Sequence, residues 1–65
     1  MSREIRDENG DLIAQVWEEN PGTVMRALKC RLGNEVRELI DYPENWHKLS
    51  DRKLYALCKA GEKSP

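Results

Sequence analysis

The chain has 65 residues and a formal net charge of −1, and Leu, Ile and Val together number thirteen. A chain of this length forms one small domain that buries about 60% of its unfolded surface, which leaves no room for an enclosed catalytic cleft. Charge near zero does not oppose collapse, so we expect a folded protein. Composition therefore argues against an enzyme and against disorder, and predicts one domain over residues 1–61 with a flexible tail over 62–65.

The first structural signal is a hairpin over about residues 3–17. Asn9-Gly10 supplies the backbone freedom that a tight turn requires, and β-forming residues flank it. Two registers compete, because a two-residue loop pairs Ile5 with Ala14 whereas a bulged turn pairs Ile5 with Ile13. In either register the second strand is apolar on both faces. We expect one face to pack on helices and the other to need a cover.

The next pattern predicts helix over about residues 21–41. Apolar residues recur at helical spacing from Val24 to Leu39. Gly33 interrupts the pattern without changing its phase, which leaves one weakened helix or two short ones. Pro43 ends this element, since the residue before a proline is pushed out of the helical region.

The last predicted element, a helix over 51–60, has the clearest boundary signals. Ser50 is a favourable N-cap, Asp51 suits the positive first turn, and Gly61 is the expected stop. The predicted fold is α+β, with an N-terminal β-hairpin followed by two or three short helices.

Three residues are candidates for catalysis or metal binding: Cys30, His47 and Cys58. A nucleophile would need a cysteine beside the histidine, and nothing in the spacing favours that arrangement. A structural zinc site needs four ligands, usually in close pairs, whereas the gaps here are seventeen and eleven residues. Both cysteines fall in apolar patterns, where free cysteine behaves as a small hydrophobe. We therefore predict no catalytic residue, no metal and no cofactor.

Protein binding is the function that uses the apolar residues left over from the predicted core. Tryptophan is enriched at binding hot spots, although both tryptophans can instead complete a small core. The predicted protein-binding residues are Leu12, Ile13, Val16, Trp17 and Trp46. The uncovered hairpin face also predicts self-association into a homodimer.

A basic C-terminal helix supports a second hypothesis, nucleic-acid binding. Its candidate residues, which would contact phosphates, are Lys48, Arg52, Lys53 and Lys59. Dedicated nucleic-acid domains of this size are usually strongly basic, and the net charge of −1 ranks this hypothesis below protein binding. A purely structural, self-associating module is the third hypothesis.

The N-terminus is polar, and no window approaches the roughly 18 apolar residues of a membrane span. We therefore expect a cytoplasmic protein with reduced cysteines and no membrane partner.

The pattern Ile5-x-Asp7-x-Asn9-Gly10-x-Leu12-Ile13-Ala14, followed by a short helix, resembles the opening of many small accessory proteins of temperate bacteriophages. The resemblance covers about residues 3–32. It implies a non-catalytic regulator that binds a host or phage protein, and it carries over no specific functional residue. The identity of the partner and the biological process do not follow from the sequence.

Overall fold

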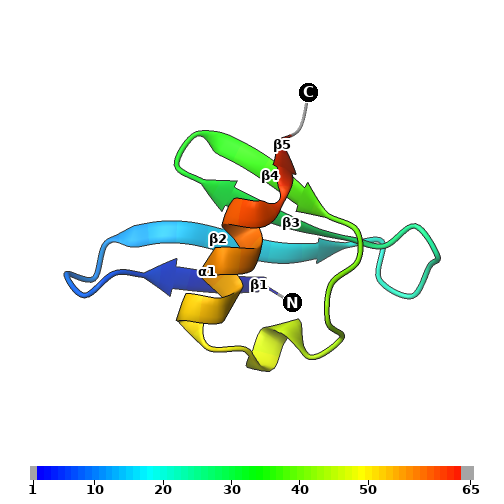
Figure 1. Ribbon diagram of the computed structural model, residues 1–65, viewed down its shortest axis with the longest axis horizontal. Coiled ribbons are helices and arrows are strands. Elements are labelled where there is room, and N and C mark those ends of the chain that lie inside the picture. The colour runs from blue at the N-terminus through cyan, green and yellow to red at the C-terminus, as the bar shows by residue number, and fades with distance from the viewer. Residues whose placement is uncertain (1, 64–65) are drawn as a thin grey trace.

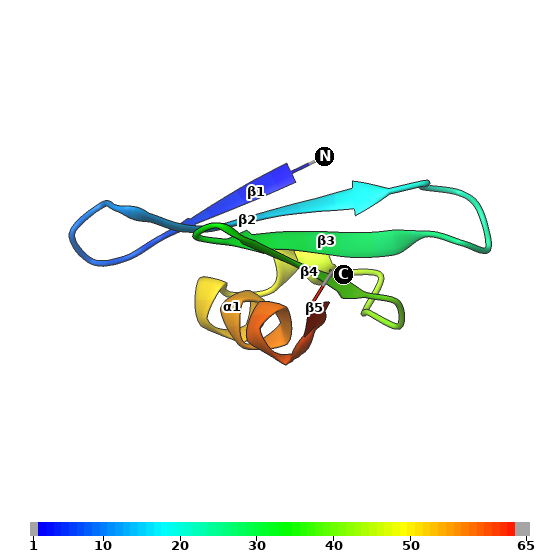
Figure 2. The same cartoon turned by 90° about the horizontal axis from the view of Figure 1, so that it is seen from above.

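The computed structural model describes residues 2–63 and contains one antiparallel sheet in the order β1-β2-β3-β4-β5. The strands are β1 (Ser2–Arg6), β2 (Leu12–Glu19), β3 (Ala27–Leu32), β4 (Glu35–Leu39) and β5 (Glu62–Lys63). A short 3₁₀ helix, η1 (Trp46–Lys48), and one α-helix, α1 (Asp51–Ala60), lie on one face of this sheet (Figures 1 and 2). Among residues 2–63, no helix covers the opposite face (Figure 2).

This sheet-dominated fold shows that the predicted hairpin followed by two or three helices was wrong. Residues 21–41 contain a loop and then β3 and β4, joined at Gly33, which has a φ of 65°. Leu28 and Cys30 are two residues apart and both point into the core, as alternate residues of a strand do. The predicted helix rested instead on the four-residue spacing of Leu28 and Leu32. β3 hydrogen-bonds to β2 on one side and β4 on the other, and such tertiary pairing overrides local preference.

The predicted hairpin is present, and it uses features of both registers. Near the turn, the Asp7 amide donates to the Asp11 carbonyl at 3.0 Å, and Gly10 has a φ of 85°, as a bulged turn requires. A second irregularity next to Ile5 then shifts the pairing by one residue, so that Ile5 faces Ala14. This second bulge returns both side chains to the core face, where each is 2% exposed.

The core fills the space between α1 and the sheet. Burial of apolar side chains on this one face is what holds the helix in place. The largest fully buried side chains are Ile5, Val16, Leu28 and Cys30 from the sheet, with Leu54 and Cys58 from α1. Both cysteines are free core residues, although the strand β3, and not a helix, carries Cys30.

Helix α1 has the bounds that the sequence predicted. The Ser50 hydroxyl accepts a hydrogen bond from the Lys53 amide at 3.3 Å, which makes it the N-cap. At the other end the Gly61 amide donates to the Cys58 carbonyl. With ten residues, α1 is too short to cross a membrane, and it is the longest helix in residues 2–63.

Gly61 then passes so close to β4 that a side chain has no space. A Cβ there would lie 3.0 Å from Leu39 Cδ1 and 3.2 Å from the Glu38 carbonyl oxygen. This close approach allows Glu62 and Lys63 to pair with β4 as strand β5, where a flexible tail over 62–65 was predicted. Residues 64 and 65 lie outside the described part of the chain.

Arg3 fastens β1 to the start of α1. Its guanidinium donates to the Leu49 carbonyl at 2.6 Å and to the His47 carbonyl at 3.4 Å, and it pairs with the Asp51 carboxylate. The His47 carbonyl lies within η1 and the Leu49 carbonyl directly after it, at a helix end where carbonyls lack helical hydrogen-bond partners. One side chain therefore sets the position of the helix relative to the sheet edge.

Candidate functional site

The face of the sheet opposite α1 is the candidate site, and we call it the uncovered face. Successive side chains along a strand point to opposite faces, so the strand register assigns residues to it. One row across the sheet consists of Ser2, Trp17, Lys29, Glu38 and Glu62, and the next consists of Glu4, Gln15, Arg31 and Val36. Figure 2 shows no helix on this face of β1, β2 and β3.

Trp17 is the one aromatic side chain on the uncovered face among residues 2–63. It is half-buried, and it is not among the side chains that pack against the core. Its indole Nε1 donates to Glu19 Oε1 at 3.3 Å, and Glu19 lies two residues along the same strand and hence on the same face. A large indole surface therefore lies beside polar groups on an open sheet.

The charges around Trp17 are of both signs. Lys29, directly across from Trp17, contacts Glu38 through its ammonium at 2.8 Å, and this hydrogen bond raises the pKa of Lys29. Glu4 pairs with Arg6 at 3.3 Å. Arg31 is exposed and makes no ion pair within residues 2–63. A mixed surface of this kind matches a protein partner better than a run of phosphates, which would require uniform positive charge.

The structure separates the five predicted protein-binding residues. Val16 is 0% exposed and Trp46 is 3% exposed, so both are core residues and offer no surface to a partner. Ile13 is half-buried and packs against the core. Leu12 is 44% exposed at the start of β2, and Trp17 lies on the uncovered face. Trp17 is thus the predicted residue that the structure places at the centre of the candidate site.

Lys29, Arg31 and Val36 belong to the uncovered face and were missed in the sequence. All three fall within the helix predicted over residues 21–41. The helical period assigns side chains to different faces from the strand period that applies here. The available signal was the alternation of Leu28 and Cys30 with charged residues.

The four basic residues of the nucleic-acid hypothesis lie on the opposite side of the molecule, on η1 and α1. All four are exposed: Lys48, Arg52, Lys53 and Lys59. The Lys59 ammonium lies 5.5 Å from the centre of the Tyr55 ring. The structure therefore does not bring these cations to the same face as Trp17.

Trp46 helps to hold a partly exposed carboxylate, that of Glu18, at the end of the core. Tyr42 donates its hydroxyl proton to Glu18 Oε2 at 2.6 Å, and Trp46 Nε1 donates to the same oxygen at 3.2 Å. The Tyr42 hydrogen bond lowers the pKa of Glu18, and burial raises the pKa of Tyr42 to about 12. A carboxylate held ionised in this way is a structural anchor for the connection between β4 and α1.

The structure brings Cys30 and Cys58 together in the core and leaves His47, the third candidate for catalysis or metal binding, outside it. His47 lies edge-on to the Trp46 ring at 5.9 Å, whereas Cys30 and Cys58 lie in the core, where the neighbouring Cys58 thiol and burial raise the pKa of Cys30. Residues 2–63 contain no group of three or more His, Cys, Asp or Glu side chains that would hold a metal ion.

Comparison of the chain with protein-family models, with curated proteins and with solved structures gave no match.

Proposed function

We propose that this protein is a small non-enzymatic regulator that binds another protein through the uncovered face, with Trp17 as the central contact. The observation that carries the proposal is a half-buried indole on a sheet face without helical cover. Tryptophan is enriched among the few interface residues that dominate binding free energy. The hairpin of the pattern that resembles bacteriophage accessory proteins is present, whereas β3 stands where that pattern has a short helix. The resemblance implies the same kind of role.

Binding of this kind requires that Trp17 contributes little to folding, so that it is available to a partner. Its absence from the core cluster supports this. The polar neighbours Gln15 and Arg31 supply donors and acceptors around it, as the rim of a protein interface does. We place this activity in the cytoplasm, where the two buried thiols stay reduced.

The test is capture of a partner from cells that produce the protein, using the wild type and Trp17→Ala side by side. We expect one protein to be retained by the wild type and lost with Trp17→Ala, while circular dichroism shows both chains folded. Lys59→Ala, on the helical side, is the matched control and should retain the partner. The purified partner should also shield Trp17 from collisional quenching of its fluorescence. Equal capture by wild type and Trp17→Ala would contradict the proposal.

The nucleic-acid hypothesis gives a different result in the same experiment. Phosphate contacts through Arg52 and Lys53 would produce retention of DNA or RNA that weakens steeply between about 50 and 200 mM salt. Such retention, lost with Arg52→Glu and unchanged by Trp17→Ala, would replace protein binding with nucleic-acid binding.

The predicted self-association through the hairpin is not assigned to the uncovered face. It rested on the apolar run from Leu12 to Trp17, with Trp17 at the contact. Val16 and Ile13 are covered by the protein's own core, and we assign Trp17, which stays uncovered, to the protein partner.

A further inference from the structure

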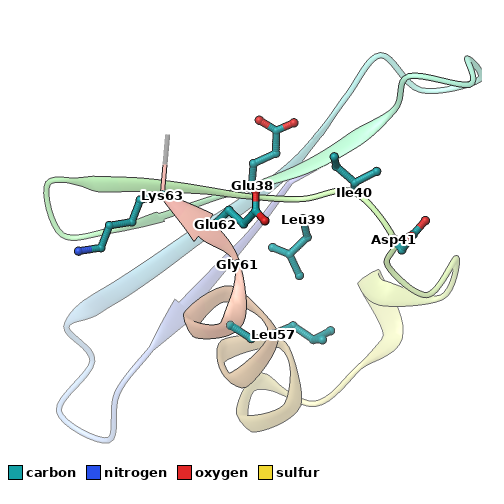
Figure 3. Close-up of a pocket in the computed structure, with 9 residues that line it drawn as sticks. Glu38, Leu39, Ile40, Asp41, Leu57, Gly61, Glu62 and Lys63 are labelled. Carbon is teal, nitrogen blue, oxygen red and sulfur yellow. The ribbon is translucent and has the colours of Figure 1, made fainter. Parts of the chain in front are cut away.

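A groove with an apolar floor runs along α1, between the helix and the chain that leads from β4 to η1, and Figure 3 shows the hollow at its β4 end. It consists of two adjoining hollows, of about 480 Å³ and about 390 Å³, which share Leu57. Leu39 from β4 and Leu57 from α1 point into the same hollow (Figure 3). Ile40 borders this end with 68% of its surface exposed, and Leu49 and Ala56 line the other end.

The two ends of the groove carry charges of opposite sign. Lys53 lines one end, whereas Asp41 and Glu62 line the other, and all three are exposed. Within residues 2–63, none of these three side chains takes part in an ion pair. Lys63 also lines the acidic end, but its ammonium lies 3.5 Å from the Glu35 carboxylate.

We propose that the groove is filled by a second copy of this chain, in a homodimer with two-fold symmetry. In a two-fold interface both protomers present the same patch. If a residue of the first protomer contacts a given residue of the second, the same pair of residues also meets with the protomers exchanged. An apolar groove with a basic end and an acidic end is complementary to itself in this arrangement, because Lys53 of each protomer meets Asp41 and Glu62 of its partner. The dimer also removes the exposed Ile40 side chain from water.

Dimerisation through the groove has two consequences. A 65-residue domain has a small core, and association with a second copy stabilises such a domain by binding only the folded state. Trp17 lies on the side of the sheet opposite α1, and the groove meets the uncovered face at the β4–β5 edge, where Glu38 and Glu62 belong to both. The dimer therefore presents two copies of Trp17. Two linked copies bind a partner with repeated sites more tightly than one does.

The experiment reverses the charge at one end of the groove at a time. Lys53→Glu gives the acidic form, and the double variant Asp41→Lys/Glu62→Lys gives the basic form. Each form alone places like charges opposite each other, and we expect the dimer Kd in sedimentation equilibrium to rise by at least about fivefold. An equimolar mixture of the two forms restores opposite charges, and we expect it to dimerise at least as tightly as the wild type.

Two further variants separate the groove from other surfaces. Lys59→Glu makes the same charge change as Lys53→Glu on a part of α1 that does not line the groove, and it should leave the Kd within about twofold. Ile40→Asp alters an exposed side chain, so it should preserve the circular dichroism spectrum of the monomer and abolish the dimer. Trp17→Ala should leave dimerisation unchanged, which makes this test independent of the proposed function.

Three results would overturn the inference. One is a wild-type chain that stays monomeric up to about 1 mM, the weak limit of a specific contact. Another is a dimer that forms equally in the wild type, in both charge variants and with Ile40→Asp. The last is a dimer lost with Trp17→Ala, which would place the contact on the uncovered face.

Discussion

Replacing each tryptophan with alanine should separate a core residue from a binding residue. Trp46 is 3% exposed, and its indole N–H donates to Glu18 at 3.2 Å. Truncating a buried tryptophan to alanine costs about 3–5 kcal/mol of unfolding free energy. A chain of 65 residues has a total of about 3–10 kcal/mol at ordinary values per residue. Trp46→Ala should therefore leave the protein unfolded or close to unfolding at 25 °C.

Trp17→Ala should cost far less. Trp17 packs on neighbouring strands across an open sheet and not into the core, and its direct cross-strand neighbour is Lys29. Cross-strand pairs and strand preference on such a surface contribute up to about 1 kcal/mol. The two substitutions remove the same number of atoms, so the expected difference of at least about 2 kcal/mol reflects the deeper burial of Trp46 and of its hydrogen bond to Glu18.

Urea denaturation followed by far-ultraviolet circular dichroism measures both values, at one low protein concentration because dimerisation adds to apparent stability. Each variant keeps one tryptophan, whose fluorescence gives a second, independent transition. Equal losses for Trp17→Ala and Trp46→Ala would show that Trp17 is a core residue. That result would refute the assignment of the uncovered face as a binding site.

Three further predictions follow from single contacts. Because the Tyr42 hydrogen bond lowers the pKa of Glu18 from its ordinary value of 4.5, this contact stabilises the fold above that pH and is lost as the pH falls through the lowered pKa. The Tyr42→Phe variant should therefore be less stable than the wild type at neutral pH, and it should lose less stability as the pH falls. Urea denaturation midpoints of both proteins between about pH 7 and pH 3 measure this difference, and the same loss in both proteins would contradict the prediction. Arg3→Ala leaves the Leu49 carbonyl without its donor and should cost about 1–3 kcal/mol, whereas Arg6→Ala on the same strand loses an exposed pair and should cost at most about 1 kcal/mol. Both cysteine thiols are fully buried, so a thiol reagent should label the native protein slowly and the urea-unfolded protein at once; rapid native labelling would show that the core opens readily.

The sequence by itself determined the features that depend on neighbouring residues. Asn9-Gly10 specifies the hairpin turn, because few residues adopt the positive φ found at Gly10. Ser50 and Gly61 set the two ends of α1, because a cap acts through hydrogen bonds within one helical turn. Trp17 was also identified as a binding candidate from its residue type and its place in the hairpin.

Only the tertiary structure decided which segments are strands and which face of the sheet is covered. The stretch from Leu28 to Leu39 fits helical and strand periods alike over such short runs, and pairing with β2 decides for strands. The same long-range pairing places Lys29 and Arg31 beside Trp17 on the uncovered face. Whether a tryptophan belongs to the core or to a binding surface depends on which face of the sheet α1 covers. The residues next to each tryptophan in the sequence do not determine that packing.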